Sequence, residues 1–231
     1  SIPEAADFVC PTDGVIFVRQ AQLRYTKGGF SVALENPETT LVGSTSSDRG
    51  ALPDLTLRYG WKGDWGTFGV GALARQLKVD RPGYYDSSFA GGLTVGGKWL
   101  MGSNDTLHYQ LTGGEGIARY IGLGITGDGV LDASDGSLDT TGVLAGYVGW
   151  RHAFSPKLRS NVIFARSDYD NDAALTGPLA TKSVQSLRAN VFYSPLPKVD
   201  VGAVLMFGKR EVESGAEGDI TRVQFTTKYS F

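Results

Sequence analysis

The carboxy-terminal segment, residues 219–231, alternates between apolar and polar side chains. One set of alternate positions is mainly apolar, and the other set is polar: Val223, Phe225, Thr227, Tyr229 and Phe231 against Arg222, Gln224, Thr226, Lys228 and Ser230. Because successive side chains of a strand point to opposite faces, this pattern predicts a strand with one apolar and one cationic face. Such a strand ending on an aromatic residue is typical of transmembrane β-barrels, with that residue at the periplasmic interface.

Strand character recurs along the whole chain. The pattern predicts eleven strands, at residues 16–25, 29–36, 53–61, 66–77, 88–100, 105–119, 141–153, 157–168, 183–193, 198–209 and 220–231. Short turns rich in Gly, Pro, Asn and Asp alternate with longer connections, which begin after Glu35, Gln76, Tyr120, Asp168 and Lys209. Outer-membrane barrels place short turns in the periplasm and long loops outside. The sequence therefore predicts an all-β, antiparallel transmembrane β-barrel.

Aromatic residues mark the short-turn end of these strands. All four tryptophans lie beside predicted short turns, at Trp61, Trp65, Trp99 and Trp150. Amphipathic rings prefer the membrane–water interface, so this set predicts a periplasmic aromatic girdle.

The strand count has a consequence for barrel closure. Eleven antiparallel strands cannot close without a parallel seam, and bacterial single-chain barrels normally have an even number. Either further strands precede this segment, which we favour, or residues 1–15 cross the barrel in another way. Residues 1–15 contain Pro, Gly and acidic residues without alternation. We expect a loop there, one that can fold into the pore, and barrel strands over residues 16–231.

Bulk composition excludes several classes of protein. The formal net charge is −2, which indicates no polyanionic partner such as nucleic acid. Mean hydropathy is −0.12, and no apolar run approaches the ~18 residues that a membrane helix needs. Barrel strands alternate apolar and polar residues, so a mean hydropathy near zero is compatible with a transmembrane barrel. Cys10 is the single cysteine, so an intrachain disulfide is excluded.

Two stretches carry a family resemblance. Residues 14–25 (GVIFVRQAQLRY) and 31–39 (SVALENPET), together with the terminal KYSF, resemble the DcaP-like porins of Gram-negative bacteria. The resemblance implies a sixteen-stranded, homotrimeric outer-membrane porin, of which this chain is the carboxy-terminal part. It also implies lipid and lipopolysaccharide as neighbours. Residues 2–4 (IPE) loosely resemble the start of a pore-constricting loop, from which Cys10 departs.

The polar face of each strand would line the lumen. Basic residues dominate that face, and we predict a solute pathway lined by Arg24, Arg58, Arg75, Lys98, Arg151, Arg159, Arg188, Arg222 and Lys228. Rings of Arg and Lys favour anions, so we expect passive diffusion of small hydrophilic solutes with a preference for anions such as carboxylates. Alternatively, these arginines pair with loop acids and only hydrate the wall. Arg19 and Arg166 fall on the apolar register.

Other chemistry has weaker signals. The connection containing Asp128, Asp132, Asp135 and Asp139 lacks calcium-loop spacing. We expect it to be a solvated acidic outer loop, and we expect no metal and no cofactor. A barrel enzyme of lipase or protease type is the alternative function, but neither His108 nor His152 has a nucleophile at a recognisable spacing. A soluble ligand-binding barrel would not concentrate tryptophan at one end.

Overall fold

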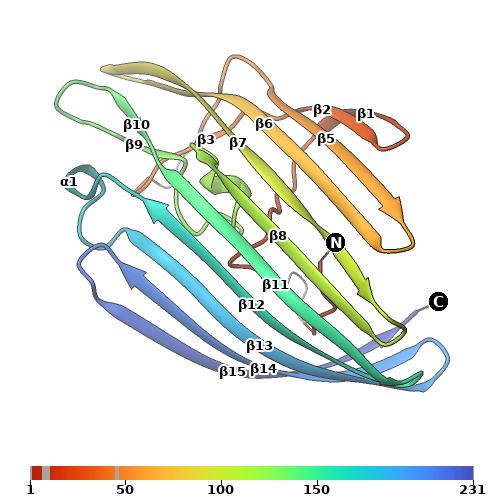
Figure 1. Cartoon of the computed structure of the whole chain (residues 1–231). Helices are drawn as coiled ribbons and strands as arrows, with labels where there is room; N and C mark the ends of the chain where they lie inside the picture. The colour runs from red at the N-terminus through yellow and green to blue at the C-terminus, as the bar shows by residue number, and fades with distance from the viewer. Residues whose placement is uncertain (1, 7–10, 45–46, 231) are drawn as a thin grey trace.

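The computed structural model describes residues 2–6, 11–44 and 47–230, so Cys10 and the terminal Phe231 lie outside the described residues. Eleven strands form one antiparallel sheet in which chain order is also spatial order (Figure 1). These strands are β1 (Gln22–Lys27), β2 (Phe30–Glu35), β5 (Asp54–Gly63), β6 (Gly66–Arg81), β7 (Tyr84–Met101), β8 (Asp105–Glu115), β11 (Gly142–Ser155), β12 (Leu158–Asp170), β13 (Thr181–Leu196), β14 (Val199–Val212) and β15 (Glu217–Tyr229).

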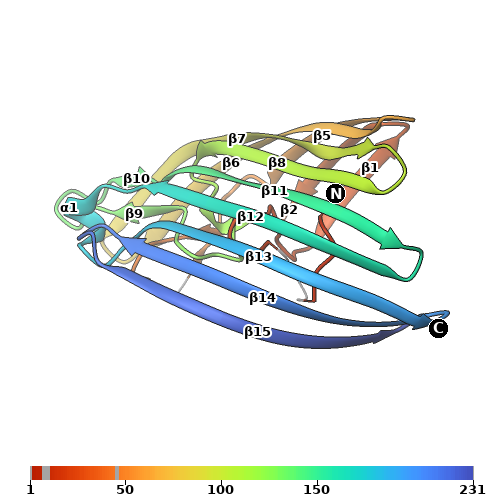
Figure 2. The same ribbon diagram turned by 60° about the horizontal axis from the view of Figure 1, so that its bottom comes forward.

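The remaining elements are short. Two small hairpins pair β3 (Thr39–Thr40) with β4 (Ser47–Asp48) and β9 (Gly129–Leu131) with β10 (Leu138–Thr140). A 3-10 turn, η1 (Ala118–Tyr120), and one helical turn, α1 (Ala173–Thr176), complete the set. Five short turns lie at the end of the sheet where the C-terminus lies, and the longer connections, together with the tight β6–β7 turn, lie at the other end (Figures 1 and 2). Across the described ranges, no helix is long and apolar enough to span a membrane.

The predicted number of strands in the main sheet is confirmed, but the boundaries differ by four residues or more in three places. The first strand begins at Gln22 rather than at residue 16, because residues 11–21 run along the inner face of the sheet instead of within it. The strand predicted over 105–119 ends at Glu115. The connection after Gln76 is not a long loop, since β6 and β7 remain paired up to Arg81 and Tyr84 and are joined by a two-residue turn.

Two features explain the length of the β6–β7 hairpin: the packing of its side chains and the geometry of its turn. Leu77 and Val79 are fully buried and pack against Leu41 and Leu138 from the connections beside them. The alternation of buried and more exposed side chains therefore continues past residue 77, where the predicted strand ends. Gly83 closes the turn with φ +87°, a left-handed conformation that side chains with a Cβ rarely adopt.

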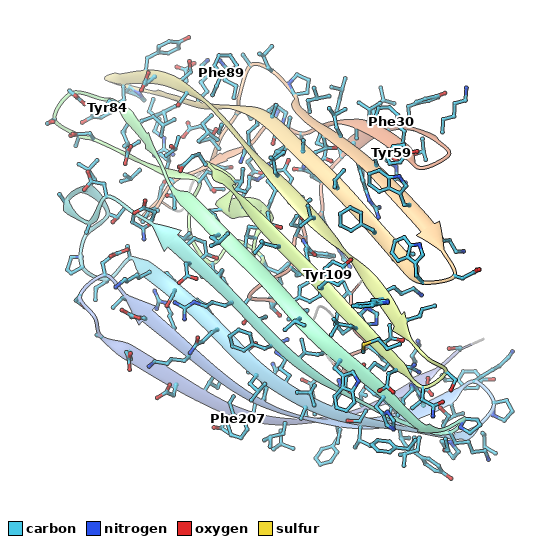
Figure 3. All side chains as sticks on the ribbon, in the orientation of Figure 1. Phe30, Tyr59, Tyr84, Phe89, Tyr109 and Phe207 are labelled. Carbon is cyan, nitrogen blue, oxygen red and sulfur yellow. The ribbon has the colours of Figure 1, made fainter. Side chains whose placement is uncertain are left out.

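The two faces of the sheet differ in polarity. Large apolar side chains project from the convex outer face, as Tyr59, Phe89 and Phe207 do in Figure 3. Phe89 and Phe225 are 80% and 78% exposed, whereas the polar alternates Arg222 and Gln224 are half-buried. All four tryptophans are exposed, beside the short turns. The predicted alternation is therefore confirmed.

Two segments pack against the concave inner face. Val15 and Phe17 pack on Tyr147 of β11 and Ala165 of β12. Residues of the β8–β11 connection, among them Ile117 and Ile121, form a second apolar cluster on the same two strands. Gly14 permits the closest approach, because a Cβ there would lie 2.2 Å from the Gly146 carbonyl oxygen. The inner face is thus crossed by chain rather than left open.

Candidate pore-lining site

A buried charged cluster fixes the β8–β11 connection to the inner face. Its members come from the connections after β2 and β8 and from β5 and β6, and we call them the arginine clamp: Glu38, Asp54, Arg75, Arg119, Tyr120 and Asp128. The side chains of Arg75, Asp54 and Asp128 are fully buried. Isolated buried charges are costly, so such groups persist only when they are paired and hydrogen-bonded.

Arg75 is the centre of the clamp. Its Nε lies 3.2 Å from Asp54 Oδ2, and its Nη1 lies 3.0 Å from Asp128 Oδ1. The guanidinium also donates to the carbonyl oxygens of Gly116, at 2.9 Å, and Glu38. One side chain of β6 therefore binds the connections on both sides of it.

Arg119 extends the clamp from η1. Its Nη2 lies 2.9 Å from Glu38 Oε2, and its Nη1 lies 3.6 Å from Asp54 Oδ2. Nη2 also donates to Gln20 Oε1 at 2.8 Å, which ties η1 to the amino-terminal segment. Asp128 accepts hydrogen bonds from the Arg119 backbone N–H at 2.9 Å and from the Thr40 hydroxyl at 2.9 Å.

Tyr120 lies between the two guanidinium groups. The central carbons of Arg75 and Arg119 are each 5.4 Å from its ring centroid, which is cation–π range. Its hydroxyl donates to Asp54 Oδ2 at 2.8 Å and accepts from Gln20 Nε2 at 2.9 Å. Burial, and after it the Asp54 charge, raise the pKa of Tyr120 above its ordinary value.

Two further predicted arginines hold the amino-terminal segment. Arg159 donates from Nε and Nη2 to Glu4, at 2.6 Å for each bond, and its Nη2 lies 3.1 Å from Asp200 Oδ1. Arg188 is buried and its Nη2 lies 3.1 Å from Asp13 Oδ1. Residues 2–6 and 11–15 are thereby fixed to β12 and β13.

Arg24 and Arg58 have a different environment. Both line a cavity of about 540 Å³ between the inner faces of β1, β2 and β5 to β8, residues 16–22 and η1. Both are exposed, and neither forms an ion pair or a side-chain hydrogen bond with any residue that the structure describes. Glu35 on the same wall accepts hydrogen bonds from Gln20 and Thr56.

The other predicted pore residues lie on the same face, with Lys98, Arg151 and Lys228 toward the short turns and Arg222 near the middle of its strand. Lys98 and Arg151 are half-buried and form no ion pair within the described ranges. Arg222 is half-buried on β15, and Lys228 is exposed beside its cross-strand neighbour Asp200. Of the nine predicted side chains, Arg75, Arg159 and Arg188 are thus paired with acids, whereas Arg24 and Arg58 are solvated. That they line a conduction path stays a prediction.

Residues on the apolar register lie away from the cavity. Arg166 is on the outer face, where its Nε donates to Asp168 Oδ2 at 2.8 Å and its Nη1 donates to Gln185 at 2.9 Å. Arg19 is exposed in the inner segment, 5.7 Å from the centre of the Phe17 ring.

The clamp residues Glu38, Asp54, Arg119, Tyr120 and Asp128 were not predicted as site residues. The expectation of a solvated outer loop is wrong for Asp128, which Arg75 and Thr40 bury. The apolar pair Ile117 and Ile121, flanking Arg119, is the signal that could have indicated a buried segment there.

No group of three metal-binding side chains occurs among the described residues. His108 is buried on the inner face. His152 contacts Asp105, with its Nδ1 2.8 Å from Asp105 Oδ1, on the outer face.

An antiparallel sheet with an apolar outer face and a charged inner face crossed by folded connections defines a porin-type channel of the outer membrane. A family model described as DcaP outer membrane protein matches residues 4–231. The chain therefore belongs to the DcaP outer membrane protein family. It is a channel protein of the Gram-negative outer membrane, and not the barrel enzyme considered as an alternative.

Solved structures agree with this fold. The chain is similar to the outer membrane channel DcaP of Acinetobacter baumannii, with a TM-score of 0.87 and 24% identity over 100% of this chain and 67% of that one. It is also similar to an anion-selective porin from Comamonas acidovorans, with a TM-score of 0.56 and 12% identity over 90% of this chain and 57% of that one. No curated protein matches the chain.

Proposed function

We propose that this chain forms part of a passive diffusion channel that prefers small hydrophilic anions, carboxylates among them. The observation that carries the proposal is the pair Arg24 and Arg58, which line a cavity of about 540 Å³ and form no ion pair with any described residue. A solvated guanidinium leaves its charge available to a passing solute, and basic pore linings favour anions.

Pairing on the rest of the inner face supports the same sign of selectivity. Glu4, Asp13, Asp54 and Asp200 each lie within ion-pair distance of an arginine. Their charges are therefore compensated, whereas Lys98 and Arg151 add to the solvated positive charge. Salt at physiological concentration screens these charges over about 8 Å, so they act on a passing solute only where the path is narrow.

Arginine also suits the proposed solutes chemically. Its planar fork can hold a carboxylate through two parallel hydrogen bonds, which a lysine ammonium cannot reproduce. In a water-filled lumen these contacts stay weak, so passage remains fast. The Comamonas porin of similar fold is described as anion-selective, and the charge arrangement above, not that likeness, carries the proposal here.

The constriction belongs to the same proposal. We infer that residues 1–15, together with the β8–β11 connection, narrow the pore, because the described parts of both segments cross the concave face of the sheet.

We further infer a homotrimer of sixteen-stranded barrels, bordered by bilayer lipid and lipopolysaccharide. Cross-linking in native outer membranes tests the trimer.

Reversal potential in a salt gradient across a planar bilayer tests the selectivity. The Arg58→Ala variant should lower the anion-to-cation permeability ratio about two- to fivefold, since a unit charge in water contributes up to ~1 kcal/mol at close range. Arg166→Ala removes an outer-face arginine and should leave the ratio unchanged. Cation selectivity of the unmodified channel, or equal effects of the two substitutions, would refute the proposal.

A further inference from the structure

A second cavity lies on the outer face of the sheet, toward the short turns. Its volume is about 290 Å³, and side chains of β8, β11 and β12 form its walls: Asp105, Trp150, His152, Phe154, Ser160 and Val162. Trp150, Phe154 and Val162 are exposed on the apolar face. The cavity therefore opens toward the membrane at the level of the tryptophan girdle, where headgroups lie.

The polar atoms of this cavity offer acceptors. Asp105, His152 and Ser160 are cross-strand neighbours in one row. Asp105 Oδ1 accepts from Trp150 Nε1 and from His152 Nδ1, each at 2.8 Å. The Ser160 hydroxyl already donates its proton to the Asn190 carbonyl oxygen at 2.6 Å. The second carboxylate oxygen and the hydroxyl lone pairs therefore remain available to a donor.

The cavity also offers negative charge and aromatic rings. Within the described ranges no lysine or arginine forms an ion pair with Asp105, whose charged-group contact is His152. The His152 ring lies 5.8 Å from Trp150 and 4.6 Å from Phe154, measured between centroids. A carboxylate beside aromatic rings is the arrangement that binds ammonium cations.

The geometry points to a membrane-facing ammonium site that takes the aminoethyl phosphate headgroup of a phospholipid. Its primary ammonium can donate to the second carboxylate oxygen of Asp105 and to the hydroxyl oxygen of Ser160. The rings of Trp150 and Phe154 contact its sides. The site lies on the face opposite the cavity of Arg24 and Arg58, so it is independent of the proposed selectivity.

Native mass spectrometry of the detergent-purified protein tests this site. The unmodified protein should retain phosphatidylethanolamine about tenfold more than phosphatidylglycerol of the same acyl chains, since hydrogen bonds to a charged group contribute about that ratio. Phosphatidylethanolamine acetylated on its nitrogen loses the ammonium charge and should be retained no better than phosphatidylglycerol. This lipid-side comparison needs no variant.

Two variants locate the binding. Asp105→Asn keeps an oxygen that can accept from Trp150 and His152, and it should abolish the headgroup preference. Trp99→Phe alters another exposed girdle tryptophan and should leave the preference intact. Equal retention of the three lipids by the unmodified protein, or an undiminished preference in Asp105→Asn, would overturn the site. A preference that emerges only after oligomers dissociate would overturn it as well, because a neighbouring copy would then cover the cavity.

Discussion

Arg75 and Arg58 lie on the inner faces of adjacent strands, β6 and β5, yet their surroundings are opposite. Arg75 is 3% exposed and contacts two carboxylates and two carbonyl oxygens. Arg58 is exposed and faces a cavity without an ion pair among the described residues. The difference follows from what covers them, because η1 and its flanking residues fold over Arg75 and stop short of Arg58.

The comparison separates two uses of one residue type. A buried arginine that compensates several acids holds chain in place, since removing either partner leaves an uncompensated charge. A solvated arginine contributes little to stability and keeps its charge available to solutes. Lumen charge counted from strand alternation alone therefore overstates the charge that a solute meets.

The largest expected effect comes from Arg119→Ala in the clamp. The substitution removes the arginine paired with Glu38 and leaves Arg75 as the arginine beside the buried Asp54. Because the partners of a charged hydrogen-bonding group are left unsatisfied, it should destabilise the protein by about 2–3 kcal/mol. The change should also free the β8–β11 connection and increase current noise in single-channel recordings. Thermal unfolding in detergent measures the stability loss.

Arg166→Ala serves as the matched control for the clamp, because it removes an exposed outer-face ion pair and should change the stability by at most about 1 kcal/mol. Equal destabilisation by the two substitutions would contradict the distinction between clamp and surface arginines.

Much of the fold was predictable because barrel strands carry a period-two pattern along their whole length. Alternation correctly placed Arg24 and Arg58 on the inner face, and Arg166 on the outer one. It failed at residues 16–21, where an apolar run followed by Arg19 and Gln20 resembles a strand, yet Phe17 packs on Tyr147 instead of pairing in the sheet. A segment lying on a sheet and a strand within it share that local pattern.

The clamp could not be predicted in the same way. Tyr120 and Asp54 are 66 residues apart, and Thr40 and Asp128 are 88 apart. Such contacts depend on how the connections fold back over the sheet, and connections have no periodicity from which to read their direction. The prediction of a solvated loop is therefore wrong for Asp128, which is fully buried.

A smaller effect is expected for Tyr120→Phe, which removes the hydroxyl bond to Asp54 and should cost about 1 kcal/mol at neutral pH. Because burial and Asp54 raise the pKa of Tyr120 in the folded protein, an unfolded chain ionises this tyrosine first, near pH 10. Its contribution is thus fully present below about pH 10 and is lost as the pH rises above that value.

Apparent unfolding temperatures between pH 8 and pH 11 measure this loss. The unmodified protein should lose stability more steeply above pH 10 than Tyr120→Phe does, by up to about 1.4 kcal/mol per pH unit. The other nine of the ten tyrosines titrate in both proteins and cancel. Parallel curves would mean that the Tyr120 hydroxyl is not shielded by the clamp.

The smallest effect concerns Lys98, a half-buried inner-face lysine without an ion pair among the described residues. Lys98→Gln should lower the anion preference less than Arg58→Ala does, because an ammonium acts as a point charge and cannot bind a carboxylate bidentately. The change should be measurable at ~0.01 M salt, where charges act over about 30 Å, and absent at ~1 M salt, where they act over about 3 Å.

Lys209→Gln, which removes an outer-face lysine 2.7 Å from Glu217, should have no effect at either concentration. A salt-independent change in Lys98→Gln would indicate altered packing of the inner face, and Lys98 would then belong with the clamp arginines rather than with Arg58.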